Sequence, residues 1–143
     1  MPITTENIFK IGSTHPAALL YDALDHFDKR NPRADENIRC IKHDLSDAVS
    51  ACVEAAGYEF SYTTQRTLLR AASFGKCFLD FHNPDEFVTM CKKLRVLNAV
   101  RDYRIGMPLT LVQFEKLTPD GLVDALVNRH QHLLAWRVCE VYS

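Results

Sequence analysis

The sequence predicts an all-α fold of antiparallel helical hairpins, stacked as a short α-solenoid of about seven helices. Apolar residues recur at spacings of three and four in one segment after another, and Pro, Gly and capping residues separate these segments at short intervals. No segment alternates apolar and polar residues long enough to indicate a strand. We expect residues 1–143 to form a single α-helical, solenoid-type domain. Because the apolar pattern still runs at Val141, we expect this domain to be a piece of a longer chain.

The first two helices are expected at 16–30 and 34–56. Pro16 suits the first position of a helix, where its missing N–H costs nothing, and Asn31-Pro32 ends the first apolar pattern. The second stripe runs from Ile38 to Ala56. Gly57 follows it, where a left-handed C-terminal cap is expected.

The third helix is expected at 63–81. Gly75 lies inside it and costs about 1 kcal/mol relative to Ala, which predicts another backbone passing close at that point. The fourth helix is expected at 84–101, with Pro84 at its first position. Asn83 is its capping residue, and Glu86 three residues later completes the pattern of a capping box.

Three short helices follow, at 110–117, 118–128 and 131–142. Thr110 and Gln113 have capping-box spacing ahead of the first, and Thr118-Pro119 begins the second. The short connections predict antiparallel neighbours.

Composition limits the classes of function. Hydrophobic residues make up 47% and charged residues 24%, as in ordinary globular proteins, so disorder is not expected. The formal net charge of −1 gives no overall basic field, so we expect no nucleic-acid partner. The first residues lack the pattern of a signal peptide, and no apolar run approaches the roughly 20 residues that span a bilayer. We therefore expect a cytoplasmic protein.

The five cysteines are odd in number, and no two lie within three residues of each other. Each lies in an apolar helical pattern, which predicts buried free thiols in a reducing compartment and not a disulfide, zinc or catalytic role. They are Cys40, Cys52, Cys77, Cys91 and Cys139.

The sequence offers little for catalysis, and we expect no catalytic residue, cofactor or metal site. Neighbouring glycines are never closer than 15 positions apart, so no phosphate-binding loop can be formed. His130 and His132 alone make a weak metal site. A helical hydrolase or transferase, the alternative hypothesis, could draw on Ser73, His43 and Asp44, but no nucleophile elbow surrounds Ser73. Two acidic pairs at i, i+3 spacing indicate solvated helix faces: Asp22/Asp25 and Asp44/Asp47.

Basic residues on and after the third and fourth predicted helices first indicate a solvated face with ion pairs, such as Arg101 with Asp102 or with a carboxylate of a neighbouring helix. The alternatives are a protein-binding rim, since Arg is favoured at interfaces, and a helical nucleic-acid-binding module that uses the basic stretch 92–104. Trp136 on the last helix would also make a good interface anchor. The candidate interface residues are Arg66, Arg70, Lys92, Arg95, Arg101, Arg104 and Trp136.

Several stretches of the sequence resemble the vacuolar protein sorting-associated protein 16 family. The likeness is carried by LRAASFGK at 69–76, LRVLNAVRD at 94–102 and IGMPLT at 105–110. Shorter stretches agree, namely IFKIGS at 8–13, AALL at 17–20, ADE at 34–36 and EAAG at 54–57. The resemblance therefore covers nearly the whole chain.

The resemblance implies a non-catalytic scaffold segment of the class C tethering complexes HOPS and CORVET, which act before membrane fusion at late endosomes and vacuoles or lysosomes. Family members have an N-terminal β-propeller followed by an α-solenoid, and this chain resembles only the beginning of that solenoid. The implied partners are other tethering-complex subunits, with membrane association only through the complex. The SM-type, SNARE-binding subunit would bind a more C-terminal stretch, so no binding residue is transferred from the family.

Overall fold

The computed structural model describes residue 6, residues 8–9 and residues 13–143, which contain seven α-helices and no strand. The all-α prediction is therefore confirmed for this part of the chain. Met1 to Thr5, to which the signal-peptide argument refers, and Gly12, one of the glycines compared above, lie outside the described residues. Contacts group the chain into two compact units, residues 1–87 and 88–143, and each is described by itself. The single solenoid-type domain over 1–143 stays a prediction.

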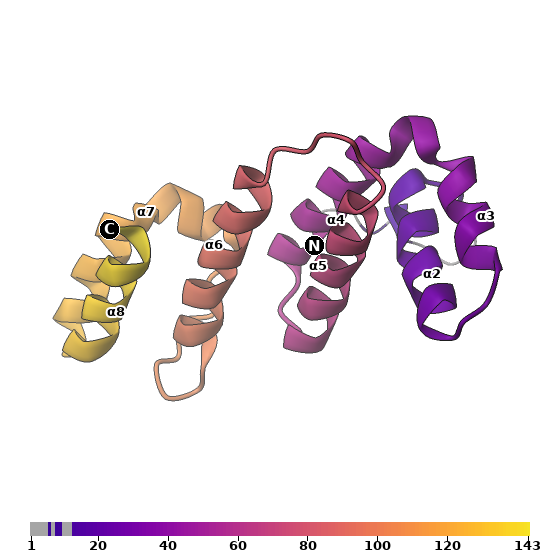
Figure 1. The fold of residues 1–143 in the computed structure, drawn as a ribbon. Coiled ribbons are helices and arrows are strands. Elements are labelled where there is room, and N and C mark those ends of the chain that lie inside the picture. The colour runs from indigo at the N-terminus through magenta and orange to yellow at the C-terminus, as the bar shows by residue number, and fades with distance from the viewer. Residues whose placement is uncertain (1–5, 7, 10–12) are drawn as a thin grey trace. The chain divides into compact units, whose positions relative to one another are not determined.

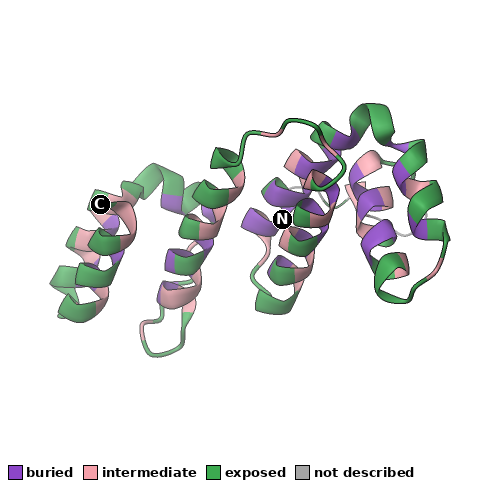
Figure 2. Cartoon of the chain, in the orientation of Figure 1, coloured by how far each residue is buried: buried purple, intermediate pink, exposed green. Residues whose placement is uncertain are grey.

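The first unit is built around α2 (Pro16–Asp28), which packs against α3 (Arg33–Cys40), α4 (Leu45–Tyr58) and α5 (Tyr62–Lys76). The helices α4 and α5 form the most extensively packed pair of this unit, and the short connection between them makes them an antiparallel hairpin (Figure 1). Buried residues, purple in Figure 2, lie on the sides of these helices that face one another. The largest of them are Leu20, Leu45, Val49, Val53 and Cys52.

The predicted helix 34–56 is wrong as one element, because the chain bends at residues 41–44. Ile41 leaves the α-helical region with φ −106° and ψ 10°, and the short 3₁₀ helix η1 (Lys42–Asp44) leads into α4. Ile41 and Leu45 are both buried, so the apolar pattern runs through the bend without interruption. The bend allows α3 and α4 to pack separately against α2.

Gly57 is not the left-handed cap that we expected. It is buried in the last turn of α4, and the helix ends at Glu59 in an extended conformation, with φ −80° and ψ 142°. A chain that leaves the helix in an extended direction needs no left-handed residue.

The predicted third helix is also too long, because α5 ends at Lys76 and not near Phe81. The amides of Cys77, Phe78 and Leu79 bond to carbonyls three residues earlier, so the end of the helix tightens into 3₁₀-type turns. Phe81 lies beyond them and is 86% exposed.

Gly75 allows close packing, as its position inside a helix predicts, but its neighbours are side chains and not the expected backbone. A Cβ atom on Gly75 would lie 2.8 Å from Val49 Cγ2 and 2.9 Å from Leu20 Cδ2. Side chains of α2 and α4, and not a passing backbone, therefore exclude a larger residue here.

The helix α6 (Asp85–Arg101) begins one residue after Pro84, which is the first helical position that a capping Asn83 predicts. The Asn83 side chain accepts a hydrogen bond from the Asp85 amide at 3.0 Å, as a capping residue does. The expected role of Glu86 in a capping box is not what the structure shows, because its carboxylate accepts a bond from the Ser50 hydroxyl of α4 at 3.1 Å.

The second unit contains most of α6 together with α7 (Leu111–Asn128) and α8 (His132–Tyr142), and α7 packs along α8. The Thr110–Gln113 capping box at the start of α7 is confirmed, with both reciprocal hydrogen bonds formed at 3.2 and 3.0 Å. The core of this unit holds Leu97, Val100, Phe114, Leu122, Leu126 and Val138.

The boundary predicted between 110–117 and 118–128 is a kink inside α7. Thr118 has φ 67° and ψ 158°, Pro119 follows it, and the Thr118 hydroxyl accepts a bond from the Gly121 amide at 3.4 Å. Thr118 thus caps the second half of α7 and, because its backbone is not helical, produces the kink; Pro119 suits the first position of that half.

All five cysteines are free, but only Cys52 is buried. Cys91 is half-buried, whereas Cys40, Cys77 and Cys139 are exposed, so the prediction of five buried thiols is wrong for these residues. Cys40 is the last residue of α3 and Cys77 follows the end of α5, where a side chain can leave the apolar stripe.

Candidate protein-binding surface

The candidate cations of the first unit lie one turn apart on α5, and both are exposed. Arg70 forms an ion pair with Asp28 at the end of α2, with 3.2 Å between Nη2 and Oδ1. This pair is the neighbouring-helix contact that the solvated-face interpretation allowed, and exposed pairs contribute little to stability. Arg66 makes no ion pair in the described part of the chain.

On α6, the cations differ in how firmly they are held. Lys93 pairs with Glu115 of α7 at 3.0 Å. Arg101 donates from Nε to the Leu109 carbonyl at 2.9 Å, and burial lowers the pKa of this guanidinium from its ordinary value. Lys92 and Arg95 are exposed, and neither has an ion pair among the described residues.

Arg104 and Trp136 complete the set of candidate residues, and both are exposed. Arg104 lies in the 102–110 connection, where its guanidinium contacts the Tyr103 ring and hydroxyl, at 3.3 Å to the oxygen. Trp136 on α8 is 59% exposed, and Leu133, one turn earlier, is 63% exposed. These two side chains form an apolar strip on α8 that the described residues leave open.

A hollow lies between α6 and α8 of the second unit, with a volume of about 270 Å³. Its deepest residues are Val96 and Val138, which are 3% and 2% exposed. Arg95 and Arg137 lie at its rim and are both exposed. We call this feature the α6–α8 groove; it is lined by Arg95, Val96, Ala99, Leu134, Arg137, Val138 and Val141.

Sequence reasoning identified only Arg95 among the residues of the α6–α8 groove. On α8, the lining positions follow the i, i+3, i+4, i+7 pattern, which usually marks a core face. Arg137, a charged residue within that otherwise apolar pattern, was the signal in the sequence that this face is not simply core. The kinked α7 separates the two helices in sequence, so their adjacency could not be read from local patterns.

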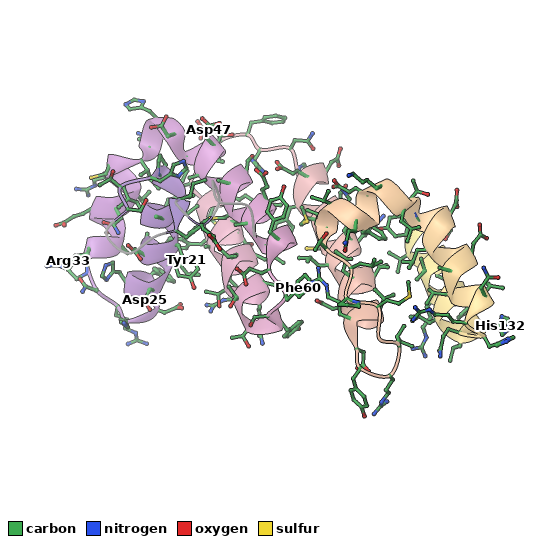
Figure 3. All side chains as sticks on the ribbon, turned by 180° about the vertical axis from the view of Figure 1, so that it is seen from behind. Tyr21, Asp25, Arg33, Asp47, Phe60 and His132 are labelled. Carbon is green, nitrogen blue, oxygen red and sulfur yellow. The ribbon has the colours of Figure 1, made fainter. Side chains whose placement is uncertain are left out.

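The candidate catalytic and metal-binding residues are not brought together. His43 and Ser73 are exposed, and no hydrogen bond joins them among the residues that the structure describes. His130 and His132 have ring centroids 6.0 Å apart, and His132 projects outward at the start of α8 (Figure 3). No group of three or more His, Cys, Asp or Glu side chains suited to a metal ion occurs in the described ranges.

The acidic pairs lie on exposed faces, as expected. Asp25 forms an ion pair with Lys29 at 2.9 Å on the surface of α2, and Asp22 is also exposed. Asp44 and Asp47 are exposed near the start of α4. In the described part of the chain, no helix is both long enough and apolar enough to cross a membrane.

Comparison with known proteins identifies relatives along almost the whole chain. The family model described as "Vps16, N-terminal region" matches residues 1–89. The vacuolar protein sorting-associated protein 16 homolog of Dictyostelium discoideum is 56% identical over 136 residues, 95% of this chain and 16% of the relative. Protein VACUOLELESS1 of Arabidopsis thaliana is 56% identical over 140 residues, 98% of this chain and 16% of the relative.

The similarity extends to Vacuolar protein sorting-associated protein 16 of Saccharomyces cerevisiae, which is 33% identical over 139 residues, 96% of this chain and 17% of the relative. The chain thus spans about a sixth of the length of the curated relatives it matches. The family model covers more than half of the chain, and identity to relatives continues through residues beyond it. The chain therefore belongs to the Vps16 family.

Proposed function

We propose that this chain is a non-catalytic scaffold segment of a membrane-tethering complex that serves vacuolar protein sorting. The observation that carries the proposal is the 56% identity to a vacuolar sorting protein over 95% of the chain. A scaffold role needs no catalytic group and acts through exposed residues of the helices.

The distribution of polar contacts supports a role in binding proteins. Arg66, Lys92 and Arg95 are exposed and carry no ion pair within the described residues, so the fold does not need them for charge balance. Trp136 is more than half exposed, although Trp is a favoured interface anchor. These groups can contact a partner without loss of an internal interaction.

Arg70, Arg101 and Arg104 are also candidate binding residues, but each already has a contact within its own unit. A partner that engages Arg70 must compete with Asp28, and one that engages Arg101 must leave its bond to Leu109 intact. We therefore assign the leading roles in binding to Arg95 and Trp136.

The proposed partners are other subunits of the HOPS and CORVET complexes, and the proposed location is the cytoplasmic face of late endosomes and vacuoles or lysosomes. The chain would reach the membrane only through the complex. The SM-type, SNARE-binding subunit would dock on a different part of the family's solenoid.

A pull-down from cytosol with the tagged 143-residue chain tests this proposal. We expect quantitative mass spectrometry to show class C tethering subunits enriched on the wild-type chain and reduced on Arg95→Glu. Arg39→Glu on α3 is the matched control, because it makes the same charge reversal on a surface outside the proposed one. Arg101→Glu also removes the hydrogen bond to the Leu109 carbonyl, so a thermal melt must show that this variant is folded before its loss of binding is interpreted. Absence of every tethering subunit from the wild-type eluate would contradict the proposal.

A further inference from the structure

We propose that the α6–α8 groove binds an acidic amphipathic helix of a partner protein. This inference rests on the proposed function as a protein-binding scaffold and specifies the chemistry of one partner. It is carried by the shape, the apolar floor and the charge of the groove.

The lining of the groove is apolar at its floor and cationic at its rim. Val96 and Val138 form a floor that is almost fully buried, and Ala99, Leu134 and Val141 are half-buried around it. The only charged groups of the lining are the two rim guanidiniums, and no acidic residue lines the groove. The groove therefore suits apolar side chains flanked by carboxylates.

The charges at the rim are not neutralised by the chain in the described residues. Neither Arg95 nor Arg137 takes part in an ion pair there. Lys93, on the same helix as Arg95, is different, because Glu115 pairs with it at 3.0 Å. Arginine favours bidentate bonds to carboxylates, so a partner with Asp or Glu beside its apolar anchors complements this rim.

The dimensions of the groove favour a helix over a small molecule. Its volume of about 270 Å³ lies just below the roughly 300–1,000 Å³ of typical ligand pockets, and its lining has no polar group apart from the two arginines. Along α8 the lining runs from Leu134 to Val141, a separation of seven positions, which is about 10 Å of helix. The apolar anchors of an amphipathic helix at i, i+3 or i+4, and i+7 span the same length.

Fluorescence anisotropy with the 143-residue chain and a fluorescein-labelled 18-residue peptide tests the inference. The peptide carries Leu at i, i+3, i+4 and i+7 and Glu at the flanking positions. One control peptide has Lys in place of every Glu, and another has Ser in place of every Leu. We expect saturable binding of the Leu/Glu peptide alone; equal binding of either control, or no binding of the Leu/Glu peptide, would overturn the inference.

Variants locate the binding site. Arg95→Glu and Arg137→Glu are each expected to weaken binding about five- to tenfold, since an attraction becomes a repulsion in each. Lys116→Glu on α7 is the matched control: Lys116 is exposed, lies outside the lining and is not a candidate interface residue, so the change is expected to alter affinity less than about twofold. An equal loss with Lys116→Glu would show a diffuse charge effect and reject the groove.

Ala99→Phe tests the hollow itself, with a circular dichroism melt to show that the variant is folded. A folded variant is expected to lose peptide binding, and undiminished binding would overturn the inference. Sedimentation velocity tests whether a second copy of the chain occupies the groove instead: a wild-type dimer that Ala99→Phe converts to monomer would also overturn the inference.

If the peptide fails to bind while the wild-type chain still captures tethering subunits, the groove inference fails and the proposed function stands. If the peptide binds but the chain captures no tethering subunit, the proposed function fails and the groove inference stands.

Discussion

Gly75 of α5 faces Leu20 of α2 so closely that a Cβ atom on the glycine would lie 2.9 Å from Leu20 Cδ2. Val49 Cγ2 of α4 would lie at 2.8 Å from the same atom. Leu20 and Val49 are fully buried, so neither side chain can move aside freely. The contact therefore fixes how closely three helices of the first unit approach one another.

Gly75→Ala should destabilise the fold by about 1–2 kcal/mol, because the cost of overpacking exceeds the gain of about 1 kcal/mol in helix propensity. Gly121→Ala is the matched control. Its Cβ would lie 3.1 Å from Leu117, whose partly exposed side chain can shift, so this substitution should be neutral or stabilising. Urea unfolding followed by circular dichroism measures both, and a stabilised Gly75→Ala protein would contradict the packing at this point.

Thr110→Ala should destabilise the second unit by about 1 kcal/mol, since it removes the hydroxyl that accepts the Gln113 amide at 3.2 Å. Thr110→Ser keeps that acceptor and should stay within about 0.5 kcal/mol of the wild type. Thermal melts of the two variants give the comparison. Equal losses for Ala and Ser would show that the cap contributes nothing.

Stability should fall at alkaline pH because of one buried thiol. Burial raises the pKa of Cys52 from 9.0 to about 12. Below pH 9 the thiol is neutral in both the folded and the unfolded chain, whereas between pH 9 and 12 only the unfolded chain ionises. The resulting stabilisation of the unfolded state is about 1 kcal/mol at pH 10.

Urea unfolding at pH 8 and pH 10 measures this loss, and Cys52→Ala is the control, because it removes the titrating group. We expect the wild type to lose about 1 kcal/mol more than the variant between the two pH values. An identical pH dependence in both proteins would contradict the buried, neutral state of the thiol.

A thiol-reactive dye should label the exposed Cys40, Cys77 and Cys139 in the native protein well before Cys52.

The Arg70–Asp28 pair should contribute less than about 1 kcal/mol, because both side chains are about half exposed. A double-mutant cycle with Arg70→Ala and Asp28→Ala isolates the coupling, and raising the salt concentration should reduce it. Arg66→Ala, one turn away and without an ion pair in the described residues, should leave stability unchanged. A coupling that survives high salt would show a pair more strongly held than its exposure predicts.

The sequence alone predicts the helical class and the strongest helix starts, because both depend on local chemistry. Spacing of apolar residues locates the helical segments, although it joins α3 and α4 into one helix, and Thr110 with Gln113 forms the capping box that their types and separation imply. The bend at 41–44 could not be predicted. Ile41 and Leu45 are four residues apart and both buried, so the periodicity is the same for a bent and for a straight helix.

The candidate surface was predictable only in part. Exposure of Arg95 follows from its residue type, whereas that of Trp136 does not, because Trp is usually buried. The α6–α8 groove depends on segments about 40 residues apart in sequence, since Ala99 and Val138 both line it. The same limit explains the cysteines. Their apolar neighbours suggested burial, yet Cys139 lies on an outer face of α8 and is exposed.

Replacement of the aligned segment in the Dictyostelium homolog by this chain tests the central claim most directly. The two segments are 56% identical over 136 residues, so the hybrid should fold. The measurement is the amount of class C tethering subunits that co-purify with the hybrid, relative to the unmodified homolog at equal expression. We predict full recovery with the wild-type segment and a marked loss when the segment carries Arg95→Glu and Arg137→Glu together. A folded, normally expressed hybrid that captures none of these subunits would contradict the account.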